Sequence, residues 1–348
     1  MIMNRVFFLI LLIAFLVIPL SINNVNEDGI TYFDLVVEIS EKLFENTDSK
    51  EKNNISLSEE QKQSISSKLQ ALSDSNNRLF DNFEEIQNEN LKDINQYIAV
   101  NRWQEFSVAK GGIKGIYLSG YHFLIEEKIN PIKDILSNTV VNTIVLDVKS
   151  DNGHLLYDSE ITEVEKLNNK RIKYDAQTLK SFKEEFDIYL IGRVVAFQDP
   201  IFSKNYPESA IKDISTSKPY AQDGQYFLDP SDSKSREYIL NVALEACLLG
   251  FDEIQFDYIR YPDTSYQGLV YDEESNSENR TKNINSFLQN ATDLLHDNGC
   301  LTSADIFGYV LNAKSDNGIG QYLETIVNTV DFISPMVYPS HYSKGSFG

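Results

Sequence analysis

The hydrophobic positions of the chain from Gly111 onward form short apolar runs that alternate with amphipathic stretches. The runs are rich in Val, Ile, Leu and Phe and predict six strands, at 113–119, 143–149, 188–197, 253–258, 301–307 and 331–338. The stretches between them predict helices at 129–136, 175–186, 233–249, 283–297 and 319–327. Pro131 suits the first turn of the first helix, and Gly250 is expected to end the third with a left-handed residue.

Nearly continuous apolar strands separated by helices are typical of a parallel sheet that is covered by helices. No GxGxxG or P-loop sequence follows the first strand, so a nucleotide-binding fold has no support. We therefore expect an α/β fold of the (β/α)8 TIM-barrel type. A closed barrel needs eight strands, and six are recognised, so we expect the barrel to be truncated after about six strands. An open or partner-completed sheet is the alternative.

The N-terminal part of the chain follows a different pattern. Arg5 precedes an uncharged apolar run, Val6 to Leu20, which fits the hydrophobic region of a secretory signal peptide and is short for a full membrane span. No small-residue cleavage site is evident near Ser21, so residues 1–22 are expected to be a signal peptide or an uncleaved membrane anchor. This segment predicts a protein that is secreted or anchored to the outer face of the cytoplasmic membrane.

The polar region that follows is rich in Asn, Ser, Glu, Lys and Gln, with apolar positions at helical spacing. We expect residues 23–109 to form a polar, mainly helical spacer and residues 110–348 to form the partial barrel. Trp103 is the only tryptophan in the chain, so a separate sugar-binding module in this region has no support.

Charge and the metal-binding residue types narrow the range of functions. The formal net charge is −21, which argues against a nucleic-acid partner because phosphates need a basic surface. The histidines are scattered without an HxH or HxxxH pair, so neither a metal nor another cofactor is predicted. Cys247 and Cys300 match no disulfide framework or metal spacing, and we interpret both as small buried hydrophobic residues.

The C-terminal ends of the strands are where a barrel collects its functional groups. Asp257 ends the fourth strand, and strand alternation places Gln255 and Asp257 on one side and Phe256 and Tyr258 on the other. Asp305 lies near the end of the apolar fifth strand; an unpaired buried carboxylate is costly, so it is either paired or used. Two carboxyl groups, one acid and one nucleophile or base, are what sugar hydrolysis needs.

Other polar and aromatic groups at these strand ends are expected to bind substrate. They are Tyr117, His122, Asp147, Lys149, Arg193, Gln255, Arg260 and Tyr338. For Asp147 and Lys149, which share a face of the second strand, we favour an ion pair. Arg193 lies in an apolar run, where it would either keep a catalytic carboxylate ionised or bridge strands. The alternative for Asp257 is a structural carboxylate that caps a loop or pairs with Arg260.

The chain resembles a glycoside hydrolase domain of secreted and membrane-anchored bacterial proteins, long known only as a domain of unknown function. The resemblance covers about residues 111–348 and rests on KGIYLSGYHF at Lys114, TIVLDVKSDNGHLLYDS at Thr143, IGRVVAFQDP at Ile191, FLDPSDSKSREYILNVALEACLLGFDEIQFDYIRYP at Phe227, SADIFGY at Ser303 and DFISPMVYPSHY at Asp331. That family is similar in outline to alpha-amylase-like barrel hydrolases. The resemblance implies that Asp257 is the nucleophile or base and Asp305 the proton donor, although the strand-five acid of the amylase group is usually Glu.

These observations predict a glycoside hydrolase that acts on a cell-envelope or extracellular polysaccharide, with a polysaccharide or oligosaccharide as its partner and with membrane contact only through an uncleaved N-terminal segment. One alternative is a non-catalytic carbohydrate-binding or envelope-scaffold protein on a degenerate barrel. Another is a polysaccharide deacetylase or lyase, which a metal-dependent activity would reveal.

Overall fold

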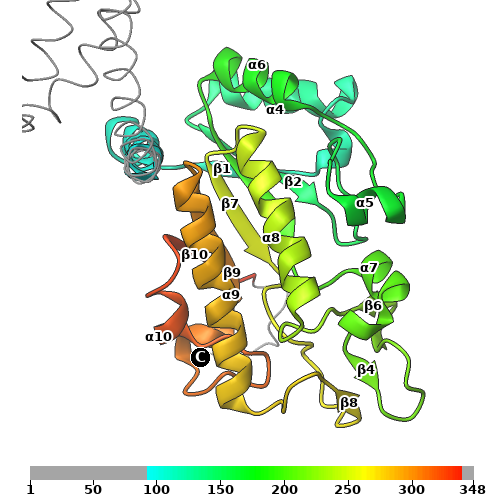
Figure 1. The fold of residues 1–348 in the computed structure, drawn as a ribbon. Coiled ribbons are helices and arrows are strands. Elements are labelled where there is room, and N and C mark those ends of the chain that lie inside the picture. The colour runs from blue at the N-terminus through cyan, green and yellow to red at the C-terminus, as the bar shows by residue number, and fades with distance from the viewer. Residues whose placement is uncertain (1–91, 339–348) are drawn as a thin grey trace, which may run out of the picture. The chain divides into compact units, whose positions relative to one another are not determined.

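The computed structural model describes residues 92–338, and its central feature is a curled parallel sheet (Figure 1). The sheet has six strands in the order in which they follow one another along the chain. They are β1 (Gly115–Leu118), β2 (Thr143–Lys149), β3 (Tyr189–Val195), β7 (Glu253–Asp257), β9 (Leu301–Phe307) and β10 (Phe332–Met336). Sequential parallel strands joined by helices form a half-barrel, which confirms the predicted (β/α)8-type fold with six strands.

The predicted helices are also present, with changed ends. They are α4 (Glu126–Asn138), α6 (Ala176–Phe186), α8 (Ser233–Leu248), α9 (Ser277–Asp297) and α10 (Leu323–Ile326). Asp232 caps α8 by accepting a hydrogen bond from the Ser235 N–H, and Gly250 follows the helix with a φ of 106°. The start predicted for the first helix is wrong, because α4 begins at Glu126 and Pro131 therefore lies inside it. In Figure 1, α8 and α9 lie side by side against the sheet.

Several short elements in the connections were not predicted. They are α5 (Thr162–Leu167), α7 (Pro200–Asn205), the antiparallel pair β4 (Lys212–Asp213) with β8 (Leu269–Val270), and the hairpin of β5 (Ala221–Gln222) with β6 (Gln225–Tyr226). Such elements are too short to show a hydrophobic period. Most of them lie in the long connection between β3 and β7.

The two faces of the sheet differ in chemistry. On the outer face, Ile254 and Phe256 of β7 are fully buried, and the Phe256 ring packs edge-on against Phe287 of α9 at 5.5 Å between centroids. Toward the C-terminal ends of the strands, the inner face carries polar groups instead, among them Arg193 and Gln255, which lie opposite one another in the register of β3 and β7. The helices thus stabilise the sheet from outside and leave the inner face available for chemistry.

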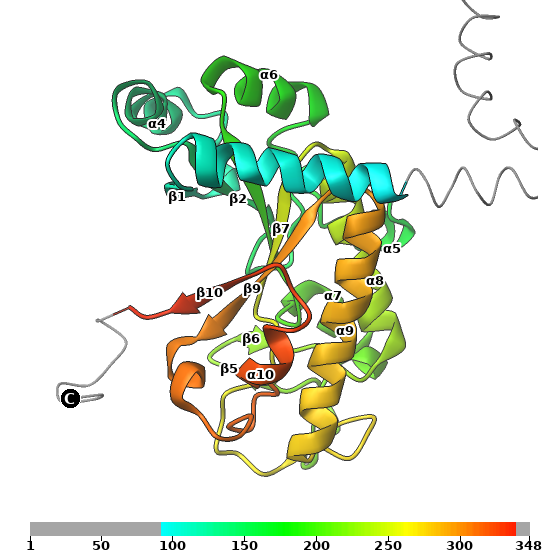
Figure 2. The same cartoon turned by 90° about the vertical axis from the view of Figure 1, so that its left-hand side faces the viewer.

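A helix over residues 92–104 and a π-helical turn, Glu105–Ala109, precede the first strand and pack against this sheet (Figure 2). The Phe106 ring lies tilted against Tyr189 at the start of β3, with 5.7 Å between ring centroids, and the Trp103 ring lies 5.5 Å from that of Phe332 at the start of β10. These rings cover the N-terminal end of the inner face. The rest of the predicted spacer and the apolar segment 1–22 lie outside the described residues. Within residues 92–338, no helix is both long and apolar enough to cross a membrane.

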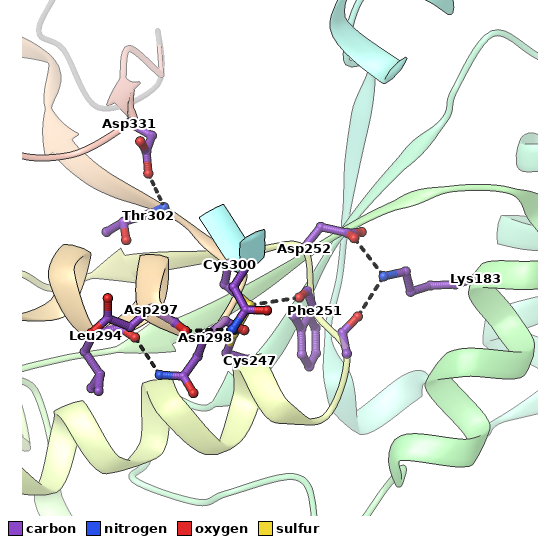
Figure 3. Close-up of a disulfide and its surroundings, with 12 residues drawn as sticks. Lys183, Cys247, Phe251, Asp252, Leu294, Asp297, Asn298, Cys300, Thr302 and Asp331 are labelled. Carbon is purple, nitrogen blue, oxygen red and sulfur yellow. Dashed lines mark hydrogen bonds and ion pairs between the residues drawn. A yellow bond between two sulfur atoms is a disulfide. The ribbon is translucent and has the colours of Figure 1, made fainter. Parts of the chain in front are cut away.

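A disulfide between Cys247 and Cys300 joins the last turn of α8 to the residue before β9 (Figure 3). The interpretation of these cysteines as two separate buried thiols is therefore wrong. The pair is 53 residues apart in sequence, but α8 runs back along the sheet and ends beside the start of the following strands. That return brings the two Cα atoms within 5.9 Å, a normal separation for a disulfide.

Candidate active site

A pocket of about 560 Å³ lies at the C-terminal ends of the strands, where a barrel of this type places its functional groups. We call it the main pocket. Its lining residues are Asp151, Arg193, Asp257, Tyr258, Arg260, Asp263, Phe307, Gly308, Tyr309, Met336 and Tyr338. Carboxylates, guanidinium groups and aromatic rings therefore converge on one cavity, a combination that suits a polar ligand with apolar faces.

Arg193 on β3 connects three carboxylates at this end of the sheet. Its guanidinium donates to Asp257 Oδ2 from Nε (3.0 Å) and Nη2 (2.5 Å), to Asp147 Oδ1 from Nη1 (2.9 Å) and to Asp151 Oδ1 from Nη2 (3.0 Å). The neighbouring strands β2, β3 and β7 supply Asp147, Arg193 and Asp257, while Asp151 follows β2. Arg193 thus bridges strands, one of the two roles that were left open for it, and is hydrogen-bonded to the candidate catalytic carboxylate.

Asp257 is held on both of its oxygens. Oδ2 accepts the hydrogen bonds from Arg193, and Oδ1 accepts one from the backbone N–H of Tyr258 at 2.7 Å. Every partner is a donor, so the carboxylate serves only as an acceptor and its position is fixed. Its ion-pair partner is Arg193, so the alternative that pairs it with Arg260 is wrong.

Asp305 on the adjacent strand β9 has a different environment. Burial raises the pKa of its carboxyl well above the usual range, and the negative charge of Asp257 raises it further. The positive charge of Arg193, and a hydrogen bond with Ser334 directly opposite on β10, lower this pKa by less than burial raises it. Asp305 therefore holds a proton at pH values where an ordinary aspartate has lost it. It is buried in the inner face and is not among the residues that line the main pocket.

The predicted ion pair between Asp147 and Lys149 is wrong because the second strand contains a register shift. Asp147 is paired with Arg193, yet Lys149 is paired with the very next residue of β3, Val194. This irregularity ends the strict alternation of side chains, so the two residues do not share a face. Asp147 instead accepts hydrogen bonds from Arg193 and from the Tyr117 hydroxyl at 2.8 Å.

Lys149 is fully buried and forms an ion pair with Asp199, which is also fully buried, at 3.0 Å. Its Nζ also donates to the backbone oxygen of Val195 at 2.7 Å. Asp199 in turn caps α7, since its Oδ1 accepts the N–H groups of Ile201 and Phe202. Lys149 is therefore a structural cation that anchors the connection after β3, and it does not reach the main pocket.

Tyr258 was expected on the face opposite to Asp257, and this is also wrong. The strand ends at Asp257, and Tyr258 has a φ of 50°, in the left-handed region that residues other than glycine rarely adopt. This turn brings Tyr258 into the lining of the main pocket beside Asp257. The same turn points the Tyr258 N–H at the Asp257 carboxylate.

Arg260 also lines the main pocket, and aromatic rings surround its guanidinium. Its Cζ atom lies 4.6 Å from the ring centroid of Phe307 and 5.0 Å from that of Tyr258. Burial lowers its pKa from the ordinary value for arginine. Arg260 thus contributes a buried cation to the lining of the main pocket and is not the ion-pair partner of Asp257.

The remaining predicted binding residues take several positions. Tyr338 lines the main pocket from the end of β10. The Tyr117 hydroxyl donates a hydrogen bond to the Asp147 carboxylate. Gln255 is buried and donates to the Ser334 hydroxyl at 2.9 Å. His122 is exposed in a short 3₁₀ turn and does not line the main pocket. The structure therefore gathers Arg193, Asp257, Arg260 and Tyr338 around one cavity and leaves the other predicted ligands outside it.

Three further residues, Asp263, Phe307 and Tyr309, line the main pocket although they were not among the residues predicted for the site. Asp263 lies in a loop beyond the strand, and no local pattern marks it. Phe307 is the last residue of β9 and Tyr309 lies in the turn that follows it, so the rule that functional groups gather at strand ends would have found both. Within residues 92–338, no group of three or more His, Cys, Asp or Glu side chains is arranged to hold a metal ion.

Comparison with known proteins places this geometry in context. Residues 115–348 match the family model described as "Putative glycosyl hydrolase domain". Among curated proteins no match is found. The crystal structure of a hypothetical protein from Ruminiclostridium thermocellum ATCC 27405 is 34% identical, with 55% of this chain and 96% of that chain covered and a TM-score of 0.49. The PgaB (BpsB) glycoside hydrolase domain from Bordetella bronchiseptica is 11% identical, with 64% and 74% covered and a TM-score of 0.50, a likeness of fold.

Proposed function

The chain belongs to the "Putative glycosyl hydrolase domain" family, and from this premise we propose that it hydrolyses a cell-envelope or extracellular polysaccharide by carboxylate chemistry at Asp257 and Asp305. Family membership makes the domain a carbohydrate-active hydrolase. One observation carries the proposed mechanism. Two carboxyl groups at the ends of adjacent strands have opposite environments, since Asp257 meets only donors while burial and the charge of Asp257 raise the pKa of Asp305.

These environments divide the two roles that glycoside hydrolysis requires. Asp305 holds a proton that it gives to the glycosidic oxygen as the bond breaks. Asp257 is the carboxylate that attacks the sugar or activates a water, and it also stabilises the positive charge that develops on the sugar ring. Arg193 is a positioning residue, because it fixes Asp257 through two of its nitrogens and ties that carboxylate to the neighbouring strands.

Two features support action outside the cytoplasm. The uncharged apolar run from Val6 to Leu20 has the character of an export signal or anchor. The disulfide between Cys247 and Cys300 is of the kind that persists in oxidising compartments. A substrate in the cell envelope or beyond it fits both features.

The decisive test replaces Asp257 with asparagine. Asp257→Asn keeps the size of the side chain, and Arg193 keeps its contacts with Asp147 and Asp151, so we expect the melting temperature to change by no more than a few degrees. Release of reducing sugar from polysaccharides, and hydrolysis of a panel of 4-nitrophenyl glycosides, should fall by a factor of about 10³ or more, because the group that meets the sugar is lost.

The matched control is Asp134→Asn on the exposed surface of α4, which should keep full activity. If Asp257→Asn is as active as the unaltered protein, the assignment of Asp257 fails. Glycan binding without turnover by the unaltered protein would instead favour the carbohydrate-binding alternative.

A further inference from the structure

We propose that the substrate spans two adjoining compartments, the main pocket and a second cavity against the β5–β6 hairpin, so that the enzyme takes an oligosaccharide or longer glycan rather than a single sugar. This inference rests on the proposed function and extends it to the length of the substrate. The hairpin lies at the end of the domain toward which the β7 arrow points (Figure 1), the same end as the main pocket.

The second cavity, which we call the hairpin compartment, measures about 310 Å³. Its lining residues are Gln198, Gln222, Asp223, Gln225, Phe227, Tyr258, Arg260, Asp263 and Phe307. Four of these, Tyr258, Arg260, Asp263 and Phe307, also line the main pocket, so the two cavities adjoin. Both volumes fall within the range of about 300–1,000 Å³ found for small-ligand sites, so each compartment can take its own sugar unit.

Arg260 lines both compartments and has N–H groups that are available to a ligand. It is 9% exposed, and within residues 92–338 its hydrogen bonding is limited to one bond, from Nη1 to the backbone oxygen of Tyr261 at 3.1 Å. A guanidinium carries five N–H groups, so several remain for a ligand. Because Phe307 and Tyr258 lie within cation–π distance of the guanidinium, its in-plane edges are the positions left for sugar hydroxyl or ring oxygens.

The hairpin contributes groups that suit sugar hydroxyls. Gln222 and Gln225 flank the turn, and each amide both donates and accepts hydrogen bonds. Gln222 Nε2 also donates to the backbone oxygen of Asp263 at 3.3 Å, which ties the hairpin to the loop that both compartments share. The Phe227 ring adds an apolar face to the lining of the compartment.

Asp257, the candidate nucleophile or base, lies on one side of this boundary together with its positioning residue Arg193. Asp257 and Arg193 line the main pocket and do not line the hairpin compartment. The hairpin compartment therefore binds without cleaving, and its occupant is the sugar unit that neighbours the one next to Asp257. Bond cleavage in the main pocket with a bound neighbour requires a chain of at least two units.

The test measures affinity against chain length. Cello-, chito-, malto- and galacto-oligosaccharides of one to four units are titrated calorimetrically into the Asp257→Asn protein, which prevents turnover. We expect at least one series to bind about tenfold tighter or more as the chain grows from one unit to three. Adding Gln222→Ala and Gln225→Ala should remove most of that gain. Both side chains lie on an exposed hairpin, so the fold should tolerate the change, which the melting temperature verifies.

Gln289→Ala on the exposed face of α9 is the matched control and should preserve the gain. The inference is overturned if no series binds, if affinity does not rise with length, or if the hairpin variant keeps the full gain. Length-dependent binding in a protein whose unaltered form hydrolyses none of these glycans would defeat the proposed function and leave the inference standing. Hydrolysis without a length effect would do the reverse.

Discussion

Asp257 and Asp305 have the same side chain on adjacent parallel strands, yet their surroundings differ. Asp257 receives hydrogen bonds from Arg193 and from the Tyr258 backbone, all to a carboxylate that only accepts. Asp305 is buried, and the charge of its neighbour works against its own ionisation. A carboxyl group whose surroundings favour its protonated form is the one to which the proposed acid role belongs.

The proton-donor role of Asp305 predicts a dependence on the leaving group. Asp305→Asn should slow hydrolysis of a natural glycosidic bond by about 10²–10⁴, the usual contribution of a positioned acid. Hydrolysis of a 2,4-dinitrophenyl glycoside should fall far less, because that leaving group departs without a proton. Steady-state rates on both substrates test this, and an equal loss on both would contradict the role.

The same assignment fixes the direction of the pH dependence. Asp305 works in its protonated form, so activity should fall as the pH rises through its raised pKa and the proton is lost. In Asp305→Asn, the residual hydrolysis of the natural glycosidic bond should no longer show this alkaline decline. A decline that persists unchanged would assign it to another group.

For Asp147 and Lys149, the residue types and their spacing do not determine which partners the two charges take. Both are charged and lie two positions apart in a strand, the usual spacing for a shared face. The register shift in β2 separates them, so Asp147 joins the Arg193 network and Lys149 pairs with the buried Asp199. The irregularity depends on how β2 meets β3, and nothing in the sequence of β2 reports it.

At the scale of elements, β7 ends at Asp257 and so places this carboxyl group at the C-terminal edge of the sheet. Glu253–Asp257 is a buried strand, as its composition predicts, and Phe256 packs outward on α9. The left-handed Tyr258 ends the alternation and places a ring on the boundary between the main pocket and the hairpin compartment. An aromatic residue in that conformation is strained by about 1 kcal/mol or more, a cost tolerated where the surroundings fix the backbone.

The disulfide is the covalent link between two such elements, α8 and β9, on either side of β7. Removing it in Cys247→Ala/Cys300→Ala should lower the free energy of unfolding by about 4 kcal/mol, since the closed loop restricts the unfolded chain. Urea unfolding of the variant and of the oxidised protein measures the difference. Reduction of the unaltered protein should reproduce most of the loss, whereas coincident midpoints would contradict a stabilising role.

At the scale of the described domain, the two ends of the half-barrel differ in the chemistry of their side chains. Trp103 and Phe106 cover the N-terminal end of the inner face, and the carboxylates and arginines gather at the other end. Apolar packing at one end and polar groups at the other is the division expected of barrel enzymes.

The proposed export of the chain predicts that Cys247 and Cys300 are oxidised in the cell. In a bacterial host, the full-length protein should resist labelling by a thiol-reactive polyethylene glycol until it is reduced, because the disulfide forms after the chain leaves the cytoplasm. Leu12→Arg, which interrupts the apolar run, should leave both thiols reactive.

Leu12→Val preserves the apolar run and serves as the control for the export experiment. Mobility on a denaturing gel reports the labelling. Equal labelling of all three proteins before reduction would argue against the proposed location.

The sequence by itself determined the order and type of the main elements, and it placed Asp257 and Asp305 at the ends of successive strands. It could do so because hydrophobic period and chain order are local properties, and successive strands of a parallel sheet become neighbours. Only the tertiary structure decided that Arg193 holds Asp257, that Lys149 turns away, that Cys247 meets Cys300, and that the hairpin adds a second compartment. Each of these depends on strand register or on chain return over long sequence distances, which no local pattern encodes.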